Sequence, residues 1–275
     1  MAPRHDELDG FGIVRVSACL RWLAQLAVDA SSAVGFGPEW YDANGLMWLV
    51  RRTTLELMRP IRRSERLSLR TWVEDFRRVR SHRVYELRDD EGADVGRGRT
   101  DWVLIATASG RPVRVPAEIE AGFGVPRDRA GTERPAWQEP PPPAQPAHLR
   151  HLVRFADLDS LVHVNNATYV DFLTEGALGL FAAAGWGLER LRGHDALPWV
   201  RRVDIEYLDA AVWGDTIEST TWIGARASDL TLHQHLARHA DAKPLVRAET
   251  AWAWRDAAGR TATIPRELLN ASLVA

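Results

Sequence analysis

Cysteine is almost absent from this chain of 275 residues, since Cys19 is the only one. A single cysteine excludes an internal disulfide framework and a cysteine-rich zinc site. An excess of basic charge is also missing, because 35 lysine and arginine residues face 37 aspartate and glutamate residues. The sequence therefore lacks the overall positive field of a nucleic-acid-binding protein.

Long apolar runs are missing as well. No stretch approaches the roughly 18–20 apolar residues that span a bilayer, and residues 1–10 contain no apolar core of a secretory signal. The sequence has no Gly-x-Ser-x-Gly elbow, P-loop or dinucleotide fingerprint. We therefore expect a soluble, cytoplasmic globular protein with no membrane or nucleic-acid partner.

Two halves of the chain overlay when the sequence is shifted by 150 residues. The matched residues are Val50-Arg51-Arg52 with Val200-Arg201-Arg202, Thr71-Trp72 with Thr221-Trp222, Arg97 with Arg247, and Thr100 and Trp102 with Thr250 and Trp252. One register that holds over about a hundred residues indicates a duplicated domain.

A proline-rich segment marks the boundary between the halves. Its prolines are Pro135, the run Pro140-Pro141-Pro142-Pro143, and Pro146. Proline fixes φ and removes a hydrogen-bond donor, so we expect an extended, semi-rigid connector. The sequence thus predicts a first unit over 1–130, a linker over 131–147 and a second unit over 148–275.

Each half has the pattern of one long helix followed by strands. Apolar residues recur at helical spacing from Asn166 to Ala184, and from about Ser17 to Val34 in the first half. Alternating residues predict strands over 216–223, 231–239 and 246–255. This order predicts an α+β fold, in which each unit is an antiparallel sheet wrapped around one long central helix. Two such sheets can pair edge to edge.

A motif stands at the start of the second predicted helix. Residues 157–169 read Asp-Leu-Asp-Ser-Leu-Val-His-Val-Asn-Asn-Ala-Thr-Tyr. This segment resembles the helix start of hotdog-fold thioesterases, where an acid precedes Gly-His-Val-Asn-Asn and a tyrosine follows. The duplicated layout resembles the acyl–acyl carrier protein (acyl-ACP) thioesterases. The resemblance implies a tandem double hotdog of the 4-hydroxybenzoyl-CoA thioesterase-like superfamily, which hydrolyses thioesters of acyl carrier protein or coenzyme A without a cofactor.

Thioester hydrolysis needs a group that activates water or attacks the carbonyl, and donors for the developing oxyanion. Asp159 precedes the predicted helix, whose first turn offers free N–H groups and a positive dipole end. The resemblance aligns Asp159 with the catalytic acid, so we assign it as general base or nucleophile. We expect the backbone amides of residues 164–166 to form the oxyanion site, and His163 to orient the water or the acid.

The other motif residues have structural alternatives. His163 could instead satisfy backbone groups, and Asn165 and Asn166 could cap the helix rather than hold substrate. Glu175 is either a second acid or a buried charge held by the repeat's arginines. The candidate substrate contacts within the motif are Val164 and Tyr169.

The first half has lost this polar cluster. The residues in the places of His163, Asn165, Asn166 and Glu175 are Ile13, Arg15, Val16 and Gln25, while Asp9 matches Asp159. We therefore expect the second unit to react and the first to shape the acyl pocket. The candidate walls of that pocket are Trp22, Met47 and Trp48, which are equally consistent with an ordinary core.

Departures from the family pattern leave other functions open. Plant-type relatives carry Asp-x-Asn-x-His, and Leu161 replaces that asparagine here. Their Glu-Cys pair corresponds to Ala210-Ala211, and Val162 stands where many relatives have glycine. The alternative is a non-catalytic acyl-thioester binding protein of the same fold. A hotdog dehydratase is disfavoured because its histidine and acid signatures are not visible.

Residues outside the motif suggest partners and exclude others. The arginine-dense stretch from Arg51 to Arg83 suits docking of an acidic carrier protein or coenzyme A phosphates, or is a solvated face. Three histidines share one strand face without an acid motif, so we expect no metal; they are His233, His235 and His239. Cys19 has no evident base, which favours a buried thiol over a nucleophile. Exposed sheet edges could pair two chains into a homodimer.

Overall fold

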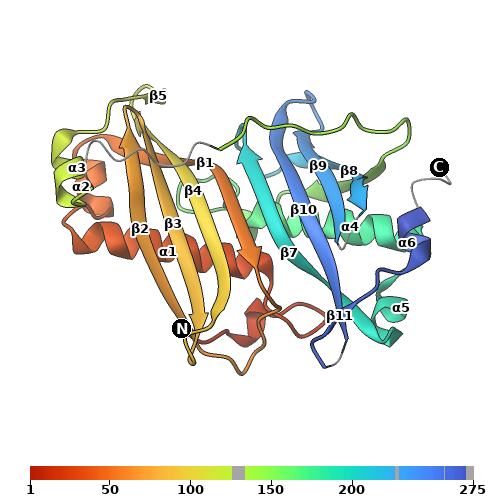
Figure 1. Ribbon diagram of the computed structural model, residues 1–275. Coiled ribbons are helices and arrows are strands. Elements are labelled where there is room, and N and C mark those ends of the chain that lie inside the picture. The colour runs from red at the N-terminus through yellow and green to blue at the C-terminus, as the bar shows by residue number, and fades with distance from the viewer. Residues whose placement is uncertain (126–133, 227–228, 257, 271–275) are drawn as a thin grey trace.

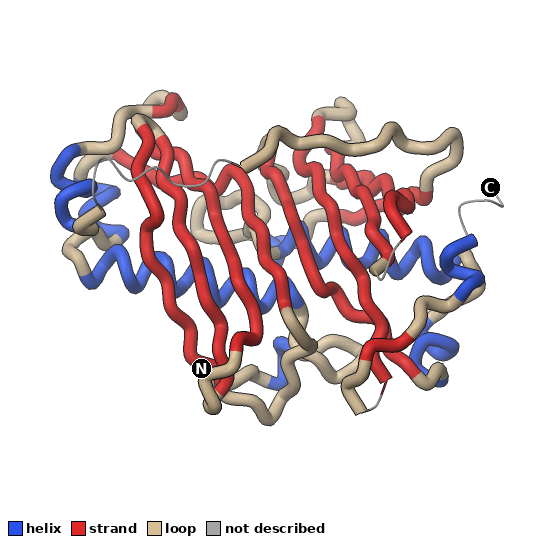
Figure 2. Tube along the Cα trace, in the orientation of Figure 1, coloured by secondary structure: helices blue, strands red, loops and turns tan. Residues whose placement is uncertain are grey.

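One antiparallel sheet of 11 strands extends across the molecule, with the long helices on one face (Figure 1). The computed structural model describes residues 1–125, 134–226, 229–256 and 258–270. The strand order is β2-β3-β4-β1-β7-β10-β9-β8-β6, with the short strands β5 and β11 added to β4 and β10. The tube view shows the main strands side by side in front of the two helices (Figure 2). The expected antiparallel α+β arrangement is confirmed.

The first half supplies four long strands and one long helix. Its elements are η1 (His5–Glu7), α1 (Val16–Ala33), α2 (Pro38–Ala43), β1 (Leu46–Leu57), β2 (Leu67–Arg77), β3 (Arg80–Asp89), β4 (Asp94–Ala106), β5 (Arg111–Pro112) and α3 (Ala117–Gly122). Helix α1 buries Cys19, Leu23 and Ala27 against the sheet. It ends at Ala33, and Gly35 just beyond it has a φ of 91°, the left-handed conformation that suits the residue after a helix C-terminus.

The second half repeats the order with one additional edge strand. Its elements are β6 (Ala147–Leu152), η2 (Phe155–Asp157), α4 (Thr168–Ala183), α5 (Leu188–Gly193), β7 (Ala196–Tyr207), β8 (Thr216–Arg226), β9 (Leu230–Arg238), β10 (Pro244–Asp256), β11 (Thr261–Ala262) and α6 (Arg266–Asn270). Leu173, Ala177 and Phe181 form the fully buried stripe of α4. The helix starts two residues later than predicted because Asn165 closes a separate turn, in which its Oδ1 accepts the Ala167 N–H at 2.9 Å.

The two halves join at one edge-to-edge seam. Strand β1 pairs with β7 in antiparallel register, with Thr53 opposite Ile205 and Leu55 opposite Val203. On the outer face, Arg52 donates from Nε and Nη2 to the two carboxylate oxygens of Asp204 at 2.8 and 2.9 Å. The seam therefore turns two sheets into one, as the edge pairing predicted from the repeat requires.

The described part of the connector, residues 134–146, has no regular strand or helix. It crosses the sheet face opposite the helices, where the Trp137 ring lies 4.9 Å from the Arg52 guanidinium and 5.3 Å from that of Arg247. Glu139 extends the contact by pairing with His235 at 2.8 Å. The extended form predicted for the linker is seen for these residues, and its first three, 131–133, lie outside the described part of the chain.

Candidate functional site

Asp159 lies in a tight turn that leads into helix α4. Its backbone N–H donates to the His163 carbonyl at 2.9 Å, and its carboxylate Oδ1 accepts the Leu161 N–H at 2.9 Å. Val162 completes the turn by donating its N–H to the Asp159 carbonyl at 3.0 Å. The Asp159 side chain is thus held by one oxygen and remains partly exposed. The structure gives its second oxygen no hydrogen bond within the described residues.

An ion pair between buried Asp157 and the exposed side chain of Arg154 supports this turn. Asp157 is 3% exposed and accepts hydrogen bonds from the Arg154 backbone N–H at 2.8 Å and the Arg154 Nη2 at 2.7 Å. Burial by itself raises the pKa of Asp157, but the hydrogen bonds and charge of Arg154 bring that pKa below its usual value. Asp157 is therefore a charged anchor of the turn rather than a free acid.

The backbone amides at the start of α4 are only partly available to a ligand. Val164 donates its N–H to the Ala211 carbonyl and Asn165 donates to the Asp157 carbonyl, both at 2.9 Å. This corrects the expectation that residues 164–166 offer three free amides, because contacts with distant chain segments satisfy two of them. Within the described chain only the Asn166 N–H of this group has no hydrogen-bond partner.

The two asparagines of the motif have different surroundings. Asn165 is a local cap, because its Oδ1 accepts the Ala167 N–H and its carbonyl accepts the Thr168 N–H at 2.8 Å. The Asn166 side chain is exposed, while its carbonyl accepts the Tyr207 hydroxyl at 3.0 Å. Of the pair, Asn166 is therefore the one that presents its side chain and its amide outward.

Tyr169 and Val164 form the buried floor of the loop. Tyr169 is 2% exposed, and its hydroxyl oxygen accepts the Ala211 N–H at 2.8 Å. Burial raises the pKa of Tyr169 to about 12, so the hydroxyl stays neutral at physiological pH. Val164 is 3% exposed. Both predicted substrate contacts are thus buried and share Ala211 as a hydrogen-bond partner.

His163 and Glu175 are both exposed. No hydrogen bond to the His163 side chain is formed by any residue that the structure describes. Glu175 projects from α4 into solvent, which overturns the interpretation of it as a buried charge held by arginines. The Glu175 side chain makes no hydrogen bond or ion pair with Asp159 in the structure. This separation is expected, because Glu175 lies about three helical turns after the start of the motif.

The three predicted pocket walls lie in different parts of the first half. Trp22 is buried in the main core, and its Nε1 donates to Glu7 Oε1 at 2.9 Å. Trp48 is half-buried and lies in a smaller cluster with Leu104, near Phe76. Met47 follows the opposite pleat of β1. Trp48 therefore belongs to the cluster that α2 and α3 cover, whereas Trp22 belongs to the main core.

The remaining predicted residues are accounted for locally. Cys19 is fully buried and burial raises its pKa to about 12, which confirms a buried thiol. His235 pairs with Glu139, His239 contacts Glu218 at 3.1 Å, and His233 is buried on the same strand. The arginine-dense stretch does not form a single face, because Arg62, Arg63 and Arg66 are exposed whereas Arg83 is buried.

Exposed apolar side chains surround the Asp159 turn, a feature that the sequence analysis did not identify. The residues are Leu152, Phe155, Leu161, Val162, Val212 and Trp213, which we call the apolar rim. Phe155 and Trp213 are 77% and 69% exposed. Backbone hydrogen bonds from Val153 to the Asp215 carbonyl and from Val164 to the Ala211 carbonyl hold these segments together.

The repeat provides a comparison that reveals the apolar rim. In the first half the positions of Phe155, Val212 and Trp213 hold His5, Arg62 and Arg63. At these three positions the apolar side chains occur only in the loop with the His-Val-Asn-Asn motif, whereas Phe11 keeps an apolar residue at the position of Leu161. A register comparison between the halves is the sequence signal that could have found them.

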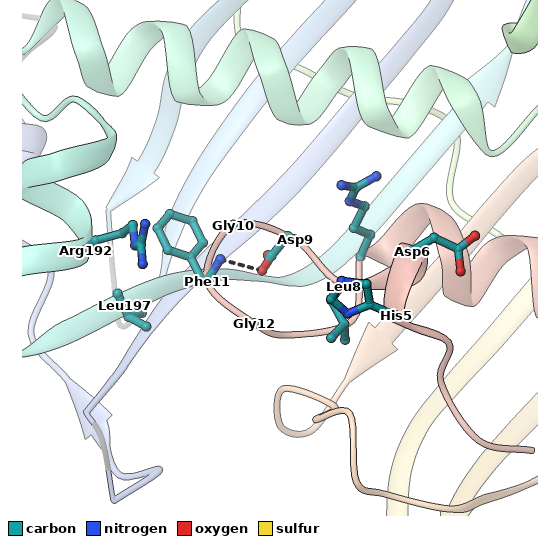
Figure 3. Close-up of a pocket in the computed structure, with 10 residues that line it drawn as sticks. His5, Asp6, Leu8, Asp9, Gly10, Phe11, Gly12, Arg192 and Leu197 are labelled. Atoms are coloured by element: carbon teal, nitrogen blue, oxygen red, sulfur yellow. Dashed lines mark hydrogen bonds between the residues drawn. The ribbon is translucent and has the colours of Figure 1, made fainter.

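The counterpart loop around Asp9 has the same turn and borders a cavity of about 800 Å³ (Figure 3). Asp9 Oδ1 accepts the N–H groups of Phe11 and Ile13 at 2.9 and 3.2 Å. Arg192 and Leu197 from the second half complete the lining. Burial outweighs these hydrogen bonds and raises the pKa of Asp9.

Cavity size alone favours the Asp9 loop, whereas the chemistry of the side chains favours the Asp159 loop. The Asp9 loop carries Ile13 and Arg15 where the other has His163 and Asn165. The Arg15 backbone N–H donates to the Glu7 carbonyl at 2.9 Å, just as the Asn165 N–H donates to the Asp157 carbonyl, so this contact does not distinguish the two loops. We give more weight to the Asp159 loop because hydrolysis needs an acid together with groups that handle water and the oxyanion.

No helix in the described part of the chain is long and apolar enough to cross a membrane. The described residues also contain no group of three or more histidine, cysteine, aspartate or glutamate side chains placed to hold a metal ion.

Solved structures share this architecture across nearly the whole chain. A candidate oleoyl thioesterase from Lactobacillus plantarum superposes with a TM-score of 0.80 at 19% identity, covering 92% of this chain and 93% of that one. The 12:0-ACP thioesterase from Umbellularia californica gives a TM-score of 0.74 at 18% identity, covering 93% and 96%. At these identities the likeness establishes the fold.

Among curated sequences, the oleoyl-acyl carrier protein thioesterase 2 of Arabidopsis thaliana chloroplasts is 27% identical over 169 residues, which is 56% of this chain. The match spans about half of that relative, 46% of its length. Residues 2–123 match the acyl-ACP thioesterase N-terminal domain, and residues 153–272 match the thioesterase-like superfamily. The first half is therefore similar to the acyl-ACP thioesterases, and the second half is similar to the thioesterase-like superfamily.

Proposed function

We propose that the protein hydrolyses fatty acyl thioesters of acyl carrier protein or coenzyme A to the free acid and the thiol. In this proposal the chain is a tandem double hotdog. Its second unit, 148–275, carries the chemistry, and its first unit, 1–130, shapes the acyl pocket. The relatives that match are named for oleoyl-ACP and 12:0-ACP substrates, which supports the substrate class.

The combination of groups in the Asp159 loop carries the proposal. This loop joins a carboxylate with one unengaged oxygen, the unpaired Asn166 N–H at a helix start and an apolar rim that suits an acyl chain. The equivalent loop around Asp9 has the carboxylate but carries His5 and Arg63 in place of Phe155 and Trp213. The second loop therefore combines groups for the carbonyl with exposed apolar side chains for its hydrophobic substituent.

Two roles for Asp159 are chemically consistent with this geometry. As a general base, its free carboxylate oxygen takes a proton from water, and the resulting hydroxide attacks the thioester carbonyl. As a nucleophile, the same oxygen forms an acyl anhydride that water then hydrolyses. In both routes the Asn166 N–H and the helix dipole stabilise the oxyanion, and the thiolate leaves and takes up a proton. His163, exposed beside the turn, would position the water.

The test is thiol release from a panel of acyl-carrier and acyl-coenzyme A thioesters, short to long. Asp159→Asn should lower kcat by at least about a hundredfold, since a positioned base contributes about 10²–10⁴. Asp9→Asn is the matched control in the equivalent turn, and we expect it to retain most of the activity. Loss of activity in Asp9→Asn with retention in Asp159→Asn would move the active site to the cavity of the first half.

A non-catalytic acyl-thioester binding protein is the second candidate. The observation that favours it is the absence of acid or amide side chains at Leu161 and Ala210-Ala211, which flank the same loop. Such a protein would bind acyl thioesters without releasing thiol from any member of the panel. Turnover that depends on Asp159 excludes it.

A further inference from the structure

Arg83 is a buried cation on the inner face of the first half. Its side chain on β3 is 5% exposed. The Nη1 atom donates to Thr71 Oγ1 at 3.3 Å, and the guanidinium carbon lies 5.4 Å from the centre of the Phe123 ring. Within the described chain Arg83 forms no ion pair, and burial lowers the pKa of its guanidinium. A buried charge in such surroundings is destabilising unless a partner offsets its lost hydration.

The second half has leucine in the same place. Arg83 pairs with Thr100 on one side and Val73 on the other, and Leu232 pairs with the equivalent Thr250 and Ile223. Leu232 is fully buried. The fold therefore accepts an apolar residue at this position, and the charge of Arg83 is not a requirement of the architecture.

The interior around Arg83 is more open than its counterpart. Val50 and Trp102, which face the helix on neighbouring strands, are partly exposed, whereas the equivalent Val200 and Trp252 are 8% and 2% exposed. These residues share the pleat that carries Thr100 and Arg83. Two inner-face residues near Arg83 are thus less covered than their counterparts in the second half.

The two halves also differ at one position of their long helices. In the second half Gly176 lets α4 lie close to β8, since a Cβ atom there would come within 2.5 Å of Ser219 Oγ. The first half has Leu26 at this position, so α1 lacks the glycine that permits the close approach.

A row of inner-face residues leads from the candidate site to Arg83. Ile205, Thr53, Thr100 and Arg83 are consecutive cross-strand neighbours on β7, β1, β4 and β3. The next inward residue of β7, Tyr207, donates its hydroxyl to the Asn166 carbonyl at the start of α4. Three strand spacings place Arg83 about 14 Å from this end of the row, within reach of a medium-length acyl chain.

We propose that Arg83 binds an anionic group at the far end of the acyl chain, so that the preferred substrates are ω-carboxyacyl thioesters. This inference rests on the proposed thioesterase function and specifies its substrate class. A carboxylate suits the planar guanidinium fork, which it engages through two parallel hydrogen bonds. The distal carboxylate takes no part in bond making or breaking and serves as the partner that the buried cation lacks.

The kinetic test compares ω-carboxyacyl and plain acyl thioesters that are matched for chain length. The wild-type chain should favour the ω-carboxyacyl substrate by at least about tenfold in kcat/KM, because hydrogen bonds to charged groups contribute about 1.5–3 kcal/mol. Arg83→Leu, which copies Leu232, should abolish this preference mainly by raising KM. Arg80→Leu removes an exposed arginine from the same strand and should leave the preference intact.

A binding measurement separates failure of this inference from failure of the proposed function. Calorimetry with dicarboxylic and monocarboxylic acids of equal length requires no turnover. Tighter binding of the dicarboxylic acid that Arg83→Leu removes supports the inference even when no thioester is cleaved. Equal affinity for the two acids in the wild-type chain overturns it, whatever the hydrolysis assay shows. If Arg83→Leu does not fold, Arg83→Met provides a linear apolar replacement for the same comparison.

Discussion

Arg21 and Asp171 occupy the same position in the two halves of the chain, and their side chains meet. The Arg21 Nη2 atom lies 3.0 Å from Asp171 Oδ2, which links the second turn of α1 to the first turn of α4. The same nitrogen also contacts Thr168 Oγ1 at 3.4 Å. Duplication thus produced a contact that a single unit could form only with a second copy, and divergence made it a pair of opposite charges.

We expect this pair to contribute little to stability, because the two side chains are 45% and 35% exposed. A double-mutant cycle with Arg21→Ala and Asp171→Ala, followed by denaturant unfolding, should give a coupling of about 0.2–1 kcal/mol that falls with added salt. The variant with the two residues exchanged, Arg21→Asp with Asp171→Arg, should restore most of the coupling energy. A coupling above about 2 kcal/mol would show that the contact is more desolvated than its exposure indicates.

Tyr169→Phe tests the attachment of the Ala211 segment to the loop. The substitution leaves the buried Ala211 N–H without its acceptor, so we expect a loss of about 1–3 kcal/mol in the free energy of unfolding. Tyr207→Phe is the control, because its partner, the Asn166 carbonyl, belongs to an exposed residue and can bind water. Hydrogen exchange at the Ala211 amide should rise in the first variant only. Unchanged exchange in Tyr169→Phe would contradict this role.

The fold could be predicted from the sequence because its signals are local. Helical spacing in residues 166–184 and the stop at Gly185 located α4 to within two residues, and strand alternation located β8 to β10. The register of the repeat predicted the arrangement of distant segments, because two units of similar sequence are expected to form two similar sheets. Their edge pairing through β1 and β7 then follows from the need to cover strand edges.

The candidate site was less predictable because its geometry depends on contacts between distant segments. The Val164 N–H donates to the carbonyl of Ala211, which lies in another loop. Because this is a contact between two backbone groups, the identity of the side chains does not reveal it. In the sequence, Arg83 is one of many arginines in a dense stretch. The number of arginines does not show which of them alternate with buried residues along a strand. Its spacing from Tyr85 and Leu87, both buried on β3, is the pattern that places it on the inner face.

Asp9→Asn should change how stability depends on pH. Burial raises the pKa of Asp9 above 3.8, so the folded state resists its ionisation. As pH rises through the ordinary carboxyl range, the unfolded chain loses this proton first and the wild-type protein loses stability until the folded pKa is passed. Asparagine does not ionise, so the free energy of unfolding of the variant lacks this dependence on pH. Relative to the wild-type protein, the variant should therefore be more stable at neutral pH than at low pH. Urea unfolding from about pH 3 to about pH 7 measures this, with the exposed Asp6→Asn as control. A variant that is less stable at neutral pH would contradict the sign.

Val162→Gly tests backbone strain in the turn that carries Asp159. Val162 has a φ of 62°, a conformation that is unfavourable for a β-branched residue, and the equivalent residue of the first half is Gly12 with a φ of 78°. Glycine removes the strain but adds freedom to the unfolded chain, so we expect the free energy of unfolding to rise by at most about 1 kcal/mol. The reciprocal change, Gly12→Val, should lower it by more than about 1 kcal/mol. Thermal and denaturant unfolding of both variants measure the pair. If Val162→Gly is stabilising but slows hydrolysis, the strained valine positions the Asp159 carboxylate; if it is destabilising, the side chain of Val162 makes contacts in the apolar rim that outweigh the strain.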